Sequence, residues 1–374
     1  MTYRHNPAPT GPLSIWRTGI DQPILMAAFA LLAIGMVLSL AAGPPAALKL
    51  GYADTFHFVK RHSLYIAAAG VTLVAMTCLS ARWVRRAAAL IFLGSLMLMA
   101  VILIAGHEAK GAQRWLRIAG FSLQPSEMVK PALIVMTGWL LAQRALYPRG
   151  PWAAITLLFF CVTLAFLLLQ PDVGQSVLLT AAFVVTFFVS GLPWRWAIAF
   201  GAGGLSLAGA LYATLPHVRF RVNSFLDPSA NTYQTEMASA AIARGGLLGA
   251  GPGEGRIKAV LPDAHTDFIY AVLAEEYGYI AALVLIGLFA FITWRGLKMA
   301  ARIHDPYPRA AASGLFTLFG LQAAINIAVN VNLIPTKGMT LPFISSGGSS
   351  LIGTALTLGF ALALIRRKSV VWKG

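Results

Sequence analysis

Residues 23–42 read PILMAAFALLAIGMVLSLAA, twenty residues in a row without a charge. A helix needs about 20 apolar residues to cross the hydrocarbon core of a bilayer, so this stretch predicts a transmembrane helix. It is longer than the apolar core of a signal peptide, and further apolar runs follow it. These two features indicate an uncleaved first span.

Nine more apolar runs follow, separated by short polar stretches. The 374 residues are 58% hydrophobic and only 11% charged, whereas soluble domains carry about 25% charged residues. We therefore predict an all-α integral membrane protein with about ten transmembrane helices and a long structured extracytoplasmic loop between helices 7 and 8. The expected spans are 23–42, 62–80, 86–105, 126–143, 152–169, 174–190, 194–214, 271–293, 311–333 and 348–365.

The distribution of charge predicts the orientation of these spans. An even number of spans puts both termini on one side. If that side is the cytoplasm, sixteen of the 29 basic residues fall in short cytoplasmic segments beside helix ends, the pattern that sets orientation. Residues 1–22 are then a cytoplasmic N-terminal segment, 23–366 a single membrane domain, and 367–374 a cytoplasmic tail.

The acidic residues are still more unevenly placed. Only Asp21 and Asp305 fall on the cytoplasmic side in this topology, and the other eleven of the 13 lie at or near the outer face. Acidic residues contribute little to orientation, so this skew indicates a functional outer surface.

The net charge of +16 does not indicate nucleic-acid binding. The basic residues flank apolar spans, where they set topology and contact anionic lipids, and no soluble basic domain is available to bind nucleic acid. Cys78 and Cys161 lie inside apolar runs. We expect them to be small buried residues, with neither a disulfide nor a metal site.

The loop between the third and fourth spans, GHEAKGAQRWLRIAGFSLQPSEMVK (106–130), leads into a helix. Ser126 is expected to cap that helix. Glu127 and Lys130 are three residues apart and share a helix face. Charges at the centre of a bilayer cost about 2.5–3.5 kcal/mol each on insertion scales. The two residues are therefore interpreted either as an ion pair that closes the helix end or as a charged pair that lines a cavity beneath the outer loops.

Two further outer loops contain candidate residues. In QPDVGQS (170–176), a tight turn places Asp172 at its tip, where it acts either as a helix cap or in the site. In IPTKGMTLPFISSGGSS (334–350), Lys337 is the single charge. The small residues at the end of that loop allow either a close backbone approach to a ligand or helix–helix contact.

The loop at about 216–270 is unusually long and does not have the composition of a disordered segment. Its central part, YQTEMASAAIARGG (233–246), predicts a helix that stops at Gly245–Gly246. Its end leads directly into the eighth span, so Asp267 is expected at the membrane surface. His265 and Thr266 come directly before Asp267 in the sequence.

Six stretches together resemble the SEDS family (shape, elongation, division and sporulation proteins). They run in family order from Gly106 to Ser350: RWL…FSLQPSEMVK, QPDVG, RVNSFLDP, GGLLGAGPG, LPDAHTDFIYAVLAEEYG and LPFISSGGSS. Within the family, Lys337 in PTKGMTLPF resembles the FtsW-like division members rather than the RodA-like ones.

The resemblance implies a ten-helix peptidoglycan glycosyltransferase that polymerises lipid II, an undecaprenyl-pyrophosphate-linked disaccharide-peptide. It implies a site on the outer face of the cytoplasmic (inner) membrane, at the division septum. It also implies a class B penicillin-binding protein as the transpeptidase partner, together with other division proteins. The family's essential Asp matches Asp267.

The expected chemistry fits the charged residues. Glycan polymerisation attacks an anomeric carbon whose leaving group is already a pyrophosphate anion, so it requires one base and several cations rather than the two carboxyls of a glycosidase. We assign Asp267 as the general base, with His265 and Thr266 beside it at the substrate. The cations that would hold the pyrophosphate are Arg114, Lys130, Arg221 and Lys337.

A divalent cation, Mg or Mn, would share this work with Glu127 or Asp172 nearby, although no ligand cluster proves one and no organic cofactor is expected. Two other functions stay open. A lipid II flippase would line a path through the membrane with charged groups, and a non-catalytic scaffold would only recruit the transpeptidase. The charges gather at the outer surface, which favours the polymerase.

Overall fold

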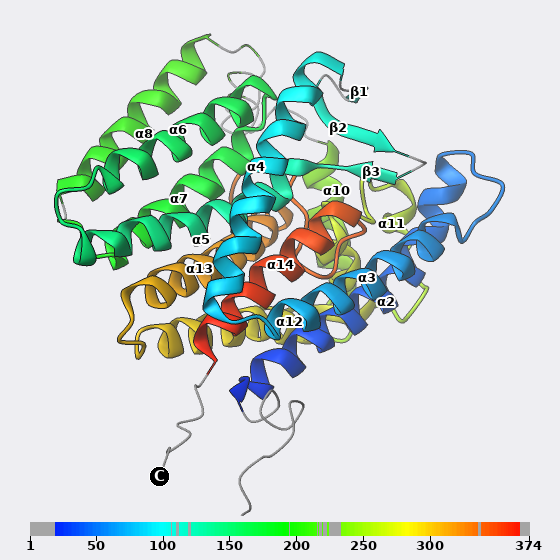
Figure 1. The fold of residues 1–374 in the computed structure, drawn as a ribbon. Helices are drawn as coiled ribbons and strands as arrows, with labels where there is room; N and C mark the ends of the chain where they lie inside the picture. Colours follow the sequence, from blue (N-terminus) through cyan, green and yellow to red (C-terminus); the bar gives the residue numbers. More distant parts are fainter. Residues whose placement is uncertain are drawn as a thin grey trace, which may run out of the picture.

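Each of the ten predicted spans overlaps a long helix in the computed structural model (Figure 1). The structure describes residues 19–105, 107–109, 112–118, 121–193, 195–214, 216, 219, 223, 233–335 and 338–366. The long helices are α2 (Gln22–Lys49), α3 (His57–Thr77), α4 (Ala81–Ala105), α5 (Pro125–Leu146), α6 (Trp152–Leu169), α7 (Val173–Val189), α8 (Arg195–Thr214), α12 (Ile269–Ala300), α13 (Pro306–Asn330) and α14 (Gly348–Ile365).

Six of these helices are long and apolar enough to cross a membrane by length and composition, within the part of the chain described. They are α2, α4, α6, α12, α13 and α14. Helix α7 is also apolar but has only 17 residues. Helices α3 and α5 carry charged residues near their starts, such as Lys60 and Lys130, which makes them more polar at that end.

The expectation of an all-α protein needs one correction, because three short strands lie between α4 and α5. Strands β1 (His107–Ala109), β2 (Ala112–Ile118) and β3 (Phe121–Leu123) form an antiparallel sheet in the order β1-β2-β3. Two of them have only three residues, too few to show the alternation by which a strand is recognised in a sequence.

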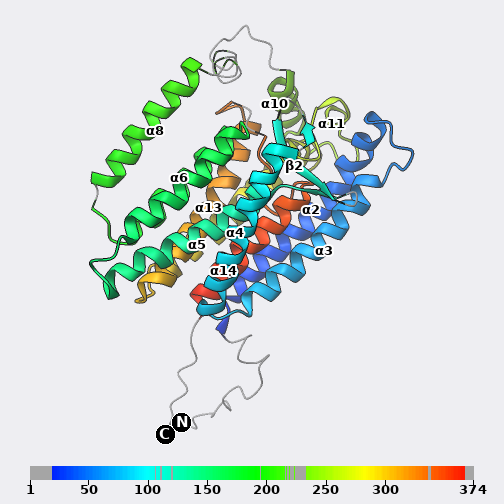
Figure 2. The same ribbon diagram turned by 45° about the horizontal axis from the view of Figure 1, so that its top comes forward.

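Helices α13 and α14 lie inside the bundle. Helix α13 packs against α5, α7, α12 and α14, and α14 also packs against α3 and α5. Both views place α6 and α8 at the edge (Figures 1 and 2). The start of α2 and the end of α14 lie at one end of the bundle, and the sheet, α10 (Tyr233–Gly245) and α11 (Ile257–Val260) at the other. All the candidate residues described below lie at this second end.

The predicted helix in the long loop is confirmed as α10, which ends at Gly245. The loop after it is fastened to α12, which is interrupted at Gly278 (φ 78°, ψ −179°). The N–H of Tyr279 donates to the Gly246 carbonyl at 2.8 Å, and the N–H of Ala250 donates to the Glu275 carbonyl at 2.9 Å. The loop therefore takes up backbone groups that the break in the helix releases.

Two smaller expectations were wrong. Helix α5 begins at Pro125 with Gln124 as its N-cap, and the Ser126 hydroxyl has no hydrogen-bond partner among the described residues. Cys78 and Cys161 are free, as expected, but both lie on the exposed surface of the bundle. A span in this fold has one face toward the lipid, so an apolar run alone does not predict burial inside the protein.

Candidate active site

A closed triangle of polar side chains lies near the starts of α5 and α7. The Lys130 ammonium pairs with Glu127 Oε2 at 3.0 Å. Gln175 donates through Nε2 to Glu127 Oε1 at 2.7 Å, and its Oε1 accepts from Lys130 Nζ. Glu127 is 3% exposed and Lys130 is 1% exposed. The predicted ion pair is thus confirmed, and it is buried and shared with a glutamine of another helix.

Arg114 of β2 and Asp172 belong to the same region. The Arg114 guanidinium donates to the carbonyl oxygens of Gln170, at 2.8 Å, and Pro171. It also lies 3.6 Å from Asp172 Oδ1. Asp172 is the N-cap of α7 and accepts from the Gln175 N–H at 3.4 Å. Arg114 therefore ties the sheet to the turn between α6 and α7.

The environment of Asp172 disfavours its charge. Burial raises the pKa of its carboxyl above the usual value, and the nearby Arg114 guanidinium acts in the opposite direction. Gln124 contacts the same carboxylate through Nε2 at 3.5 Å. The four predicted residues Arg114, Glu127, Lys130 and Asp172 are thus brought together, and we call them, with Gln175, the charged network.

Asp267 lies in the loop that precedes α12 and is half-buried. Its N–H donates to the Asp263 carbonyl at 3.0 Å. Its own carbonyl oxygen accepts from the side-chain amides of Asn326 and Asn330, both at 2.9 Å. Its carboxylate Oδ2 lies 3.7 Å from the place a Cβ would take at Gly338. The backbone of Asp267 is therefore fixed on α13, and its carboxylate faces the loop after that helix.

The residues beside Asp267 are held by the loop that leads into α14. The Ser346 N–H donates to the His265 carbonyl at 2.9 Å, and the Ser345 hydroxyl donates to the Thr266 carbonyl at 2.6 Å. Ser349, four residues further along, bonds the N–H of Gln124 at 2.9 Å. The 345–349 segment thus connects the Asp267 loop on one side with the charged network on the other.

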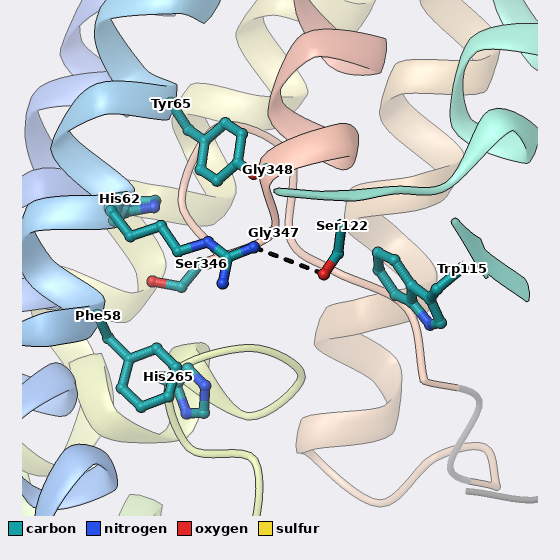
Figure 3. Close-up of a pocket in the computed structure, with 10 residues that line it drawn as sticks. Phe58, His62, Tyr65, Trp115, Ser122, His265, Ser346, Gly347 and Gly348 are labelled. Carbon is teal, nitrogen blue, oxygen red and sulfur yellow. Dashed lines mark hydrogen bonds between the residues drawn. The ribbon is translucent and has the colours of Figure 1, made fainter. Parts of the chain in front are cut away.

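A pocket of about 250 Å³ opens between α3, the sheet and these two loops (Figure 3). Phe58 and His62 of α3 face Ser122 and Trp115 of the sheet across it. Of the predicted site residues, His265 lines it, and its ring centroid lies 4.7 Å from that of Phe58. The lining residues are Phe58, Arg61, His62, Tyr65, Trp115, Ser122, His265, Ser346, Gly347 and Gly348.

Gly348 belongs to the small-residue stretch, and besides lining the pocket it makes a close contact within the protein. A Cβ at Gly348 would lie 2.2 Å from Tyr65 Cζ. In α14, a Cβ at Gly353 would lie 2.7 Å from the Glu127 carbonyl oxygen. These glycines allow α14 and the loop before it to approach α3 and α5 closely. Arg221 and Lys337, the two other predicted cations, lie outside the described residues.

The charged network does not fit a divalent cation as it is arranged. Both oxygens of Glu127 and both oxygens of Asp172 already face N–H donors, whereas Mg²⁺ and Mn²⁺ require oxygen ligands free of such donors. Within the ranges that the structure covers, no group of three or more His, Cys, Asp and Glu side chains could hold a metal.

Several residues of this region were missed from the sequence. Asn326 and Asn330 lie one turn apart in an apolar span, and their cost in such a place was a signal that could have revealed them. Arg61 and His62 lie in the second turn of α3, a helix of mixed polarity, and gave no comparable signal. Gln175 stands three residues after the Asp172 cap, a spacing that is routine at helix starts.

Glu275 and Glu276, two other acids at the same end of the bundle, have a structural role. The Glu275 carboxylate accepts from the backbone N–H groups of Arg256 and Ile257 at 2.8 Å and Lys258 at 3.0 Å. Glu276 pairs with the Lys258 ammonium. These contacts hold the start of α11 against α12.

The sequence of this chain is similar to one protein family over nearly its whole length. The model of the cell cycle protein family of FtsW, RodA and SpoVE matches residues 22–369. A probable peptidoglycan glycosyltransferase FtsW of Caulobacter vibrioides is 50% identical over 359 residues, covering 95% of this chain and 92% of that protein. One of Geobacter sulfurreducens is 37% identical and covers 93% of this chain and 95% of its own length.

Solved structures share the fold. A chain of a peptidoglycan synthase complex, studied for the coordination of polymerization and crosslinking, is 28% identical with a TM-score of 0.76, over 92% of this chain and 97% of that one. The rod shape determining protein RodA of Thermus thermophilus is 26% identical with a TM-score of 0.69, over 92% and 96%. This chain is an integral membrane protein that belongs to the FtsW/RodA/SpoVE family, and its curated relatives are FtsW proteins.

Proposed function

We propose that this protein is a peptidoglycan glycosyltransferase that polymerises lipid II into glycan strands during cell division. Relatives at 50% and 37% identity over most of the chain are named as probable enzymes of this kind. The observation that carries the proposal is the position of Asp267, whose backbone is held on α13. Two asparagines hold its backbone, and the loop that holds it also forms one wall of the pocket.

The topology we propose has ten spans with both termini in the cytoplasm. Basic residues support it, because Arg82, Arg295 and Arg366 lie at the end of the bundle where α2 begins and α14 stops. The sheet, α10, α11 and the Asp267 loop then lie on the outer face of the cytoplasmic membrane, where a lipid-linked saccharide presents its sugars.

Asp267 acts as the general base in this reaction. Its carboxylate takes the proton of the acceptor sugar hydroxyl as that oxygen attacks the anomeric carbon of the donor. The bond between that carbon and the lipid pyrophosphate breaks, and the pyrophosphate leaves as an anion. The hydrogen bonds from Asn326 and Asn330 fix where the base stands, which lowers the entropy cost of reaching the reactive arrangement.

Cations stabilise the leaving pyrophosphate, and we assign this role to Arg114, Lys130, Arg221 and Lys337. Lys130 is buried and paired, so in this conformation it acts through the field of the charged network. Burial raises the pKa of Asp172, so its carboxyl binds a proton more readily than an exposed aspartate does. Protonation would remove a negative charge that offsets Arg114 and Lys130, which suits an anionic leaving group.

The partner we propose is a class B penicillin-binding protein, the transpeptidase that crosslinks the new strands, at the division septum with other division proteins. The similarity to a chain of a peptidoglycan synthase complex supports such an assembly. The flippase alternative is not favoured, because the charged network and Asp267 both lie at one end of the bundle instead of along a path across it.

The experiment is polymerisation of labelled lipid II by the purified protein with its class B partner, in the presence of a transpeptidase inhibitor. Glycan strands longer than the disaccharide are expected. In vesicles, a flippase would make lipid II accessible on the opposite face without forming strands. A scaffold would do neither, and either result would contradict the proposal.

A further inference from the structure

His62 is an unexplained polar residue at the pocket wall. It is 2% exposed, and although the Gly35 backbone lies near its ring, neither ring nitrogen makes a hydrogen bond of normal geometry with any described residue. Buried polar groups in native proteins are almost always hydrogen-bonded. A neutral imidazole offers one donor and one acceptor. A ligand in the pocket that His62 lines would supply the missing partner.

The other lining residues indicate which ligand that is. Phe58, Tyr65 and Trp115 present aromatic rings, and Arg61 is the single fixed cation among the described lining residues. Arg61 lies 3.5 Å from the Ser122 hydroxyl, with its guanidinium carbon 5.8 Å from the Tyr65 ring centroid. A pyrophosphate needs several cations. A sugar ring instead places C–H groups on aromatic faces and hydroxyls on neutral donors and acceptors.

The size of the pocket limits the ligand to one ring. Its volume is about 250 Å³, below the roughly 300–1,000 Å³ of sites that enclose drug-sized ligands. A disaccharide-peptide does not fit as a whole. The pocket is also next to the proposed chemistry, because His265 lines it and lies two residues before Asp267.

We propose that this pocket is a sugar-ring subsite in which His62 hydrogen-bonds one N-acetylated sugar of the lipid-linked substrate. The inference rests on the proposed function and adds that different residues bind the sugar and the pyrophosphate of the substrate. The aromatic pocket binds the sugar, while the charged network and the remaining cations attract the pyrophosphate. His62 is then a substrate-binding residue, and Trp115 provides a stacking face from the sheet.

The test compares two probes in equilibrium binding to the purified protein with its partner. One is fluorescent lipid II, and the other is undecaprenyl pyrophosphate, which has no sugar. His62→Phe keeps an aromatic ring and removes both hydrogen-bonding groups. It should weaken lipid II binding about 5- to 30-fold, the effect of one or two hydrogen bonds, and leave undecaprenyl pyrophosphate binding unchanged. His62→Gln, which keeps a donor and an acceptor, should stay within about 3-fold of the native protein.

The control is Ser63→Ala on the next residue of α3, whose hydroxyl bonds the Val59 carbonyl at 2.8 Å and does not line the pocket. It should bind both probes normally. If His62→Phe does not fold, Trp115→Leu on the half-buried strand replaces it, with the same selective loss expected. Equal loss of both probes, or loss of neither, overturns the subsite.

These outcomes differ from a failure of the proposed function. Absence of glycan strands with the native protein contradicts the polymerase. Normal strand formation together with unselective binding by His62→Phe contradicts the subsite alone.

Discussion

The side-chain amide of Asn330, on the last turn of α13, donates a hydrogen bond to the backbone carbonyl of Asp267 at 2.9 Å. Asn330 is fully buried, and its Oδ1 accepts from the N–H of Ala271 at 3.1 Å. One side chain therefore fixes both the loop that carries the proposed base and the first turn of α12.

Asn330→Leu should lower kcat about 10-fold, because it removes one of the two amides that hold the Asp267 carbonyl and one acceptor of the Ala271 N–H. Each of these hydrogen bonds contributes about 0.5–1.5 kcal/mol, and their loss gives the base more freedom to move. The KM for lipid II should change less than kcat. Steady-state polymerisation kinetics would measure both. Thr317→Val is the control on α13, because its hydroxyl bonds the Ser313 carbonyl of the same helix. Native kinetics for Asn330→Leu would show that this anchor does not position Asp267.

Variants of the Glu127–Lys130 pair can distinguish a role in protein stability from a role in stabilising the pyrophosphate. Lys130→Met or Glu127→Gln alone should destabilise the protein by about 3–5 kcal/mol, since each leaves a buried charge unpaired. The double variant should regain much of this stability, as read by thermal unfolding in detergent. If Lys130 stabilises the pyrophosphate, the double variant should fold stably but still polymerise lipid II poorly. Full recovery of activity in the double variant would limit the pair to a structural role.

The kink of α12 at Gly278 should tolerate no side chain. A Cβ there would lie 2.4 Å from the Leu247 carbonyl oxygen, and the backbone φ of +78° with ψ near 180° is a region for glycine. Gly278→Ala should cost about 3 kcal/mol or more. Gly287→Ala, further along the same helix with nothing within 4 Å of the new Cβ, should stabilise by about 0.5–1 kcal/mol. Equal unfolding temperatures for the two variants would refute this reading of the kink.

Asp172 gives a pH dependence whose sign follows from its pKa. Burial raises the pKa of the folded protein's Asp172 above the ordinary 3.8, so the unfolded chain loses this proton more easily than the folded one. The stabilising contribution is therefore present below pH 3.8 and lost as the pH rises through the higher folded pKa. Asp172→Asn keeps an N-cap acceptor and removes this titration.

At neutral pH, Asp172→Asn should unfold at the same temperature as the native protein or a higher one, and its advantage should shrink on acidification. Thermal unfolding in detergent between about pH 5 and 8 measures this. A variant less stable than the native protein at neutral pH would mean that the Arg114 contact outweighs burial.

The sequence predicted the parts of this fold that depend on local pattern. Apolar runs located ten helices, and the three-residue spacing placed Glu127 and Lys130 on one helix face, where they pair. A helix cap was one of the two roles expected for Asp172, and the structure shows that cap. Contacts between residues far apart in the sequence were not predictable. Asp267 and Asn330 are 63 residues apart, and no periodicity connects them.

The same limit applies to the pocket and the sheet. The contact between Tyr65 and Gly348 depends on how α3 packs against α14. No local pattern in a single sequence predicts that packing. The small-residue stretch before α14 allowed two interpretations, contact with a ligand or contact within the protein. Gly348 packs on Tyr65, and Gly347 and Gly348 also line the pocket. The three-residue strands were too short to recognise.

The most direct test of the account is strand formation from purified lipid II by Asp267→Asn, assembled with its class B partner. The variant keeps the size of the side chain and removes the base, so we predict a loss of about 10²- to 10⁴-fold, the usual contribution of general base catalysis, with lipid II binding retained. Asp54→Asn, an exposed acid paired with Lys60, is the matched control and should polymerise normally. Native rates of polymerisation by Asp267→Asn would contradict the assignment of the base.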